Sequence, residues 1–267
     1  MNTQSKTSII ESRELLLSDV FRLLNGEILA IRILDFASIE LCEYWGKRMA
    51  QSNFQRYSNA QEIMVSKIGM TYFETENKPH LLSHYFEVAD NMSVHLGELF
   101  NPKPEPLGLI HDAFKRVWPH SMQIRQLEGR NMCPGILRRI EGKNMMGLPP
   151  HQDMIIKELD NAHQDQLIKC QLATNLYIKV PDEGGELELW DYSPSLAEVA
   201  ELYTGVYDFI DRSKLPAAIT IKPQQGEFII FRSNSIHAVA GCENADRTAA
   251  SCFIGYYGDN HPLYYWS

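Results

Sequence analysis

The sequence predicts an α+β protein in which a β-rich C-terminal half forms a jelly-roll or barrel-like double sheet, with N-terminal helices packed outside it. Two observations predict this class. Apolar residues recur at helical spacing over most of the first 120 residues, whereas short β-rich runs bounded by Gly, Pro or Asn appear from residue 135 onward. A length of 267 residues lies near the top of the single-domain range, so we expect one domain, residues 1–267.

The first part of this domain, residues 1–134, is predicted to be mainly helical and to support the sheets. Apolar residues three and four positions apart predict helices at residues 12–24, 38–50, 81–99 and 106–117. One strand is expected at residues 27–34. An Asn-Gly pair ends the first helix and an Asn-Pro-Lys-Pro run separates the last two, because Gly and Pro interrupt regular structure.

The second part, residues 135–267, is predicted to form the double sheet. Strands are expected at residues 136–140, 173–180, 186–190, 218–221, 226–231 and 248–257. A Pro-Asp-Glu-Gly-Gly turn joins two of them. An insertion at about residues 192–215 contains an expected helix, residues 195–203, with enough apolar side chains to dock on the sheets. We interpret this insertion as a lid, since long insertions that are not disordered are usually functional.

The charge and cysteine content narrow the function classes. The chain has 25 Lys and Arg against 34 Asp and Glu, a net charge of −9, and no stripe of cations. A nucleic-acid partner is therefore not expected, because affinity for phosphate backbones depends mostly on cations. The five cysteines are scattered without a C-x-x-C pair, which suits a reducing cytoplasm. The N-terminal residues lack an apolar signal and the sequence lacks a long apolar run, so neither export nor a membrane span is expected.

The central chemical signal is a set of three residues from two predicted strands. In an extended segment, residues two positions apart point to the same side, so His151 and Asp153 can present an imidazole nitrogen and a carboxylate oxygen to one metal ion. His237, directly after a β-rich run, would complete two histidines and one carboxylate. Such a set leaves adjacent coordination positions open and suits Fe(II) oxygen chemistry better than a closed zinc site.

Arg247 lies ten residues after His237, at the start of the next predicted strand. A guanidinium group is always charged and forks onto carboxylates, which makes it suited to a dicarboxylic cosubstrate. His151, Asp153, His237 and Arg247 together resemble the pattern of the iron(II)- and 2-oxoglutarate-dependent oxygenases, over roughly residues 135–258. That resemblance implies a cupin-like double-stranded β-helix fold.

The resemblance also implies the chemistry. Fe(II), 2-oxoglutarate and O2 would be used to oxidise, most simply to hydroxylate, an unactivated C–H bond of a small molecule, with release of succinate and CO2. His151, Asp153 and His237 would hold the metal, and Arg247 would bind the distal carboxylate of the cosubstrate. Many members carry a serine two residues after that arginine.

In this sequence that serine position is Ala249, so Thr248 or Ser251 would have to take its role. Strand alternation favours Ser251, which shares a side with Arg247. Asn175 and Tyr177 share one face of a predicted strand and are candidates for contact with substrate or cosubstrate.

Arg138 and Arg139 are adjacent on the predicted strand at residues 136–140. Alternation sends one of them inward, where it would meet a carboxylate of the substrate. We take Arg138 as the candidate.

The layout of the chain most resembles small free-standing enzymes that hydroxylate N-acylated amino acids or halogenate indole alkaloids. The shared features are the N-terminal helical half, a strand at residues 137–142 and a Gly-Gly-Glu-Leu hairpin at residues 184–187. Halogenating members replace the metal carboxylate by Gly or Ala to make room for chloride. Because Asp153 is present here, the resemblance implies a hydroxylase acting in biosynthesis on an amino acid derivative or natural-product intermediate.

Two alternatives stay open at this stage. One is a cupin-type metalloenzyme that does not use 2-oxoglutarate, and the other is a non-enzymatic cupin binding module. Neither the substrate, nor the position and type of oxidation, nor the oligomeric state follows from the sequence, because these depend on the shape of the pocket.

Overall fold

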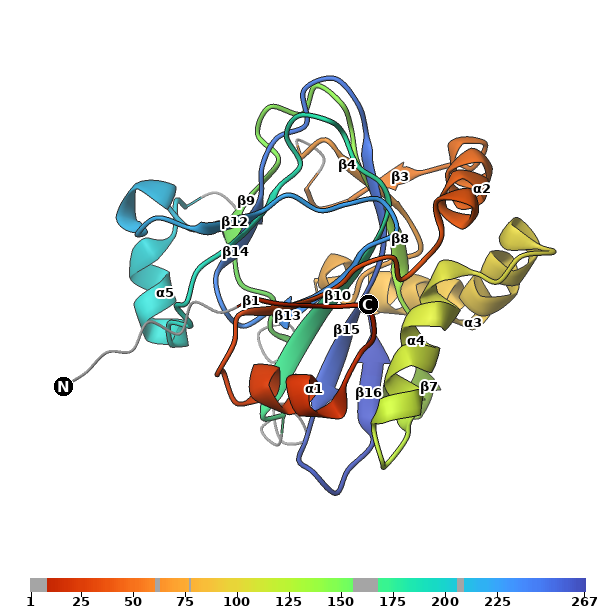
Figure 1. Ribbon diagram of the computed structural model, residues 1–267, viewed down its shortest axis with the longest axis horizontal. Coiled ribbons are helices and arrows are strands. Elements are labelled where there is room, and N and C mark those ends of the chain that lie inside the picture. The colour runs from red at the N-terminus through yellow and green to blue at the C-terminus, as the bar shows by residue number, and fades with distance from the viewer. Residues whose placement is uncertain (1–8, 61–62, 77, 156–167, 206–208) are drawn as a thin grey trace.

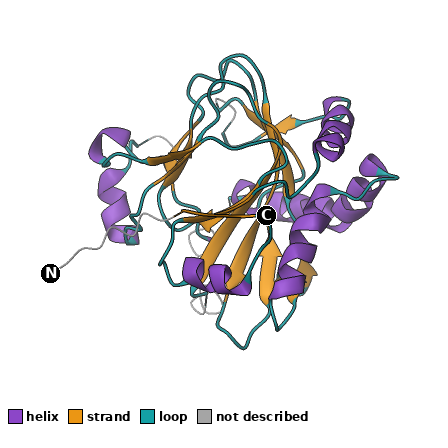
Figure 2. Ribbon diagram, in the orientation of Figure 1, coloured by secondary structure: helices purple, strands orange, loops and turns teal. Residues whose placement is uncertain are grey.

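The structure is a computed structural model that describes residues 9–60, 63–76, 78–155, 168–205 and 209–267. Two sheets lie on either side of the interior (Figure 1). Helices α2 (Ile39–Ala50), α3 (Pro79–Phe100) and α4 (Pro106–Val117) lie outside the larger sheet, and α5 (Leu196–Leu202) lies outside the smaller one (Figure 2).

The larger sheet has ten strands, eight of which form one hydrogen-bonded path. In spatial order these are β1 (Ile9–Ser12), β2 (Ala30–Ile33), β13 (Phe228–Arg232), β10 (Cys170–Lys179), β15 (Arg247–Tyr256), β8 (Ile136–Ile140), β4 (Val65–Ile68) and β3 (Gln55–Arg56). Strand β16 (Leu263–Trp266) pairs with the far half of β15, and β5 (Met122–Ile124) pairs with β16.

The smaller sheet has four strands, in the order β12 (Ile219–Ile221), β11 (Leu187–Leu189), β14 (His237–Val239) and β9 (Leu148–His151). The remaining elements are short: α1 (Leu17–Leu24), the 3-10 helices η1 (Tyr72–Thr75) and η4 (Arg212–Lys214), and a hairpin of β6 (Gln126–Leu127) and β7 (Arg130–Asn131). From β8 to β15 the chain passes repeatedly between the two sheets, which is the connectivity of a jelly roll.

The predicted helices occur where local signals define their ends. Helix α2 begins after Ser38, whose hydroxyl accepts a hydrogen bond from the backbone N–H of Leu41, and it buries Cys42, Trp45 and Met49. Helices α3 and α4 each have Pro at the first position, where the missing N–H costs nothing.

Residues 1–134, expected to be mainly helical, also contribute strands to the larger sheet. Strands β1 to β4 come from this part and extend the larger sheet on both edges. The first predicted helix, residues 12–24, begins only at Leu17, because Ile9 to Ser12 pair with β2 instead. Strand β2 lies within the strand expected at residues 27–34. Strands β1, β3 and β4 have two to four residues, too few for a period to be read from the sequence, and only their sheet partners define them.

Two packed layers result. The main core fills the space between the helices and the outer face of the larger sheet. A second cluster lies between the sheets and includes Tyr177, Leu187, Ile229, Phe231 and Ala249. All five cysteines are buried free thiols. Within the described part of the chain, no helix combines the length and apolar character needed to cross a bilayer.

His111 on α4 makes the stability of this fold depend on pH. Its ring stacks on Tyr265 with centroids 3.9 Å apart, hydrogen-bonds the backbone of Pro134, and leaves Nε2 buried without a partner. Burial lowers the pKa of His111 to about 4, so the native state keeps it neutral while the unfolded chain protonates it below about pH 6.5.

We therefore expect this residue to contribute a loss of about 2 kcal/mol in the free energy of unfolding between pH 7 and pH 5. The variant His111→Phe keeps an aromatic ring against Tyr265 and should show a correspondingly smaller drop in denaturant titrations at the two pH values. Equal drops in wild type and variant would contradict this assignment.

Candidate active site

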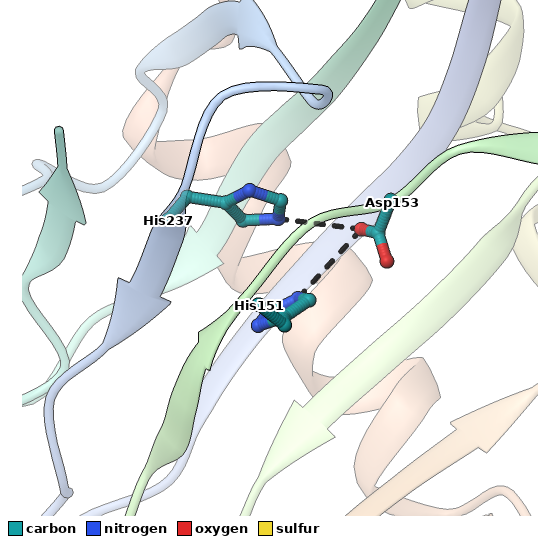
Figure 3. A group of neighbouring side chains, drawn as sticks. All are labelled: His151, Asp153 and His237. Atoms are coloured by element: carbon teal, nitrogen blue, oxygen red, sulfur yellow. Dashed lines mark hydrogen bonds and ion pairs between the residues drawn. The ribbon is translucent and has the colours of Figure 1, made fainter. Parts of the chain in front are cut away.

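One strand pairing brings the predicted metal ligands together. In the antiparallel pair β9 and β14, His151 lies directly opposite His237. Their ring centroids are 4.2 Å apart, and Asp153 follows two residues after His151 (Figure 3). Candidate ligand atoms from the three side chains all lie within 4.8 Å of one another.

The backbone of Asp153 is fixed by three hydrogen bonds. Its N–H donates to the carbonyl of Ser233 at 2.9 Å, and its carbonyl accepts from the Ser233 hydroxyl at 2.9 Å and the Gln171 amide at 3.2 Å. The carboxylate can therefore face the two histidines although β9 ends before it.

Backbone carbonyls select the tautomer of both histidines. Nδ1 of His151 lies 2.7 Å from the Pro149 carbonyl, and Nδ1 of His237 lies 3.0 Å from the Ser235 carbonyl. Because a carbonyl only accepts, each Nδ1 carries the proton and each Nε2 presents a lone pair. Both Nε2 atoms point to the Oδ2 atom of Asp153, at 3.7 Å and 3.3 Å respectively.

The charge state of the three groups suits a cation. Burial opposes ionisation of Asp153, but the neighbouring His151 and His237 hold its pKa well below the ordinary value. Burial, followed by the neighbouring His151, lowers the pKa of His237, so that ring favours its neutral form. Two imidazole nitrogens and one carboxylate on one face form a donor set that fits a divalent transition metal with open coordination positions.

Arg247 lies on the inner face of β15, beside this cluster. Its Nη2 donates to the Tyr177 hydroxyl at 2.9 Å, whereas its Nε is buried without a partner. The hydroxyl of Ser251 donates to the Asn175 side chain at 2.8 Å. These residues, Tyr177 excepted, line a small cavity together with His151, Asp153 and His237. A buried arginine with an unpartnered N–H fits a carboxylate ligand at this place.

Thr248 is placed differently from the other candidates. It alternates with Arg247 and Ala249 along β15, so it shares the outer side of the strand with Ala250, which belongs to the core beneath the helices. Thr248 lines neither cavity described here.

A larger cavity of about 320 Å³ adjoins the metal candidates. His151, Asp153 and Arg138 line both this cavity and the smaller one. The rest of its lining comes from distant parts of the chain and includes Tyr57, Ile63, Val65, Thr75, Leu148, Phe253 and Trp266. Phe253 lies on the long strand β15, whereas the others belong to loops, short strands and the 3-10 helix η1. Sequence reasoning missed these residues because the segments that carry them meet only in the folded chain.

The insertion at residues 192–215 packs against the outer face of the smaller sheet. Val199 and Ile210 contact Ile236 and Ala238, and a capping box formed by Ser195 and Glu198 begins α5. Residues 206–208 lie outside the described part. Phe209 lines the larger cavity, with its ring centroid 6.3 Å from that of His151.

Comparison with known proteins gives three findings. The family described as carrier-protein-independent halogenase WelO5 matches residues 15–267. An L-gamma-glutamyl-L-propargylglycine hydroxylase from Streptantibioticus cattleyicolor is 29% identical over 153 residues, which are 57% of this chain and 55% of that protein. The match thus spans about half the length of that relative.

The third finding concerns solved structures. An N-substituted L-amino acid dioxygenase from Burkholderia ambifaria superposes with a TM-score of 0.64 at 18% identity, covering 94% of this chain and 91% of that chain. Its complex with alpha-KG gives a TM-score of 0.62 at 18% identity, covering 94% and 90%. At this identity the likeness describes the fold.

The ligand set generates a direct prediction about metal binding. Asp153→Ala should weaken binding of Co²⁺, a redox-stable probe, by roughly 100-fold or more, because even the loss of a group that only supports a ligand costs 10- to 100-fold. Isothermal titration calorimetry measures this. Asp182→Ala, which removes an exposed carboxylate in the turn before β11, is the matched control and should bind Co²⁺ like wild type. Equal affinity of both variants would count against the site.

Proposed function

From the premise that the chain belongs to the family of the carrier-protein-independent halogenase WelO5, we propose that it is an Fe(II)- and 2-oxoglutarate-dependent oxygenase that hydroxylates a small molecule. The observation that carries the proposal is the joint placement of His151, Asp153 and His237 beside the buried Arg247. The substrate class we propose is an amino acid derivative, as in the names of the Streptantibioticus and Burkholderia proteins.

The residues of the chain have distinct roles in this proposal. His151, Asp153 and His237 would hold Fe(II) through the two Nε2 atoms and the carboxylate. When bound, the metal together with O2 and 2-oxoglutarate supplies the oxidising power, and the products of the cosubstrate are succinate and CO2. The protein contributes binding, orientation and exclusion of water.

Arg247 would bind the distal carboxylate of 2-oxoglutarate. The Tyr177 hydroxyl orients the guanidinium, and Asn175 with Ser251 forms the neighbouring polar wall. The small cavity around Arg247 favours a 2-oxoglutarate-dependent enzyme over a cupin that does not use this cosubstrate. A cupin without 2-oxoglutarate would have no ligand for a buried arginine whose Nε lacks a partner.

Asp153 decides between the two reactions suggested by the family and its relatives. In the halogenating oxygenases that this chain resembles, Gly or Ala stands at this position and leaves room for chloride. The carboxylate of Asp153 fills that room here. The two backbone carbonyls that fix the histidine tautomers, together with the anchored backbone of Asp153, make all three groups available at once. Hydroxylation is therefore the reaction that we propose.

Finer features of the chain accompany this function. The passage of β8 to β15 between the two sheets supports a double-stranded β-helix. The position of Phe209 in the cavity wall supports a lid role for residues 192–215. The buried free thiols and the net charge of −9 support a cytoplasmic enzyme with a small-molecule substrate and no nucleic-acid partner.

Arg247 provides a test of the cosubstrate assignment. Arg247→Gln should weaken binding of 2-oxoglutarate to the Co²⁺-loaded protein by about 10- to 150-fold, the equivalent of a charge-assisted hydrogen bond of 1.5–3 kcal/mol. Tyr177→Phe should weaken it less, because the hydroxyl only orients the guanidinium. Calorimetry measures both, and Arg116→Gln on the exposed face of α4 is the control. Unchanged affinity in Arg247→Gln would favour a metalloenzyme without this cosubstrate.

The reaction itself is tested by turnover. Protein with Fe(II), O2 and 2-oxoglutarate should form succinate in response to members of a panel of N-acyl amino acids and γ-glutamyl dipeptides. Mass spectrometry should show one added oxygen atom and, with chloride present, no chlorinated product. Asp153→Ala should be inactive. A chlorinated product, or no substrate-dependent succinate with any member of the panel, would overturn the proposal.

A further inference from the structure

A second arginine, the half-buried Arg138, lies on the inner face of the larger sheet. Strand register places Lys67 opposite Arg138, Arg138 opposite Ala249, and Ala249 opposite Tyr177. The four side chains therefore form one row across β4, β8, β15 and β10. Ala249, the smallest of the four, separates Arg138 from Tyr177 in this row.

Arg138 is incompletely satisfied by the protein. Its side chain is hydrogen-bonded to Tyr57, but Nε is buried without a partner. Among the described residues no ion pair joins Arg138 to a carboxylate, and it is the only Lys or Arg among those that line the larger cavity. A buried guanidinium N–H without an acceptor costs free energy that a bound anion would recover.

Its neighbour Lys67 is neutralised. Nζ of Lys67 lies 3.0 Å from the carboxylate of Glu74, and both side chains are 3% exposed. Glu74 also accepts a hydrogen bond from the backbone N–H of Thr71 at 2.9 Å, as part of the capping box that begins η1 beside the cavity. Lys67 therefore needs no further anion, whereas the charge of Arg138 remains available inside the cavity.

Tyr57 contacts both Lys67 and Arg138. Nζ of Lys67 lies 5.2 Å from the centroid of the Tyr57 ring, and the Tyr57 hydroxyl meets Arg138. The ring is thereby held in the cavity wall with its hydroxyl beside the guanidinium. Apolar side chains, including Ile63, Val65 and Leu148, line the same cavity.

We infer that the substrate is an organic carboxylate whose anionic group is bound by Arg138 and Tyr57, with its apolar remainder against the wall from β4 and β9. This inference rests on the proposed function and specifies the substrate for it. Each arginine then serves a different anion: Arg247 the cosubstrate in the small cavity, and Arg138 the substrate in the larger one. Neutral analogues of the same size should bind more weakly, because they would leave the charge of Arg138 unpaired.

The test compares acids with their neutral amides. Protein loaded with Ni²⁺ and 2-oxoglutarate, which does not turn over, is titrated calorimetrically with N-acetyl-L-leucine, N-acetyl-L-phenylalanine and the corresponding primary amides. We expect at least one acid to bind, and its amide to bind at least about 10-fold more weakly. Arg138→Gln should weaken binding of that acid by about 10- to 100-fold and should weaken 2-oxoglutarate binding less than it weakens binding of the acid. Arg138→Lys should recover part of the loss.

The neighbouring Arg139 supplies the matched control. Its Nε donates to the Ser66 hydroxyl at 3.2 Å and its guanidinium covers the Phe54 ring, so it faces away from the cavity. Arg139→Gln makes the same charge change on the same strand and should bind the acid like wild type.

Four results would overturn the inference: equal binding of acid and amide, no binding of any acid, equal losses in both arginine variants, or a loss of 2-oxoglutarate affinity in Arg138→Gln as large as the loss of acid affinity. Failure of the proposed function is a different result, namely that no substrate supports succinate formation. The two failures can be told apart because the calorimetric titrations need no turnover.

Discussion

The antiparallel pairing of β9 with β14 is the constraint on which the site depends. With His151 opposite His237, the two imidazoles meet on one face of the smaller sheet and Asp153 follows on the same side. A slip of one residue in this register would send one histidine to the other face. The strands have four and three residues, so much of their register is set by contacts beyond the ladder, such as the bonds between Ser233 and Asp153.

The two faces of the larger sheet have different tasks. The outer face, with Ala250 and Ile254 of β15, packs against the helices and supplies the main core. The inner face carries Arg247, Ala249 and Ser251, of which two are polar and one is small. Fully packed inner faces would stabilise the fold more, but they would leave no space beside the metal candidates. Alternation along one strand thus serves stability on one side and ligand binding on the other.

Several charged side chains lie around the two cavities, and they differ in how far protein groups neutralise or hydrogen-bond them. Lys67 and Glu74 neutralise one another and hold η1 in the cavity wall. Arg247 is oriented by the Tyr177 hydroxyl, and its Nε has no partner. Arg138 shares a hydrogen bond with Tyr57 and also keeps an unpartnered Nε. Two arginines that each keep a buried Nε without a partner are costly for the free protein, and such groups are expected where ligands complete the hydrogen bonding.

The sequence by itself determined the features that short-range patterns encode. Helical periodicity with Ser38 and Pro106 at helix starts predicted α2 and α4, and β-rich runs bounded by Gly, Pro or Asn predicted β8, β10 and β15. The spacing of His151, Asp153, His237 and Arg247 predicted that these four residues lie close together.

The tertiary structure alone decided what depends on contacts distant in sequence. It assigned Ser251 to the polar wall and Thr248 to the opposite face, added β1 to β4 to the larger sheet, and brought Tyr57 to Arg138. A local period states which side of its own strand a residue occupies, but not which other strand lies beside it. Pocket walls and strand partners are set by global packing, and for that reason they could be recognised only in the folded chain.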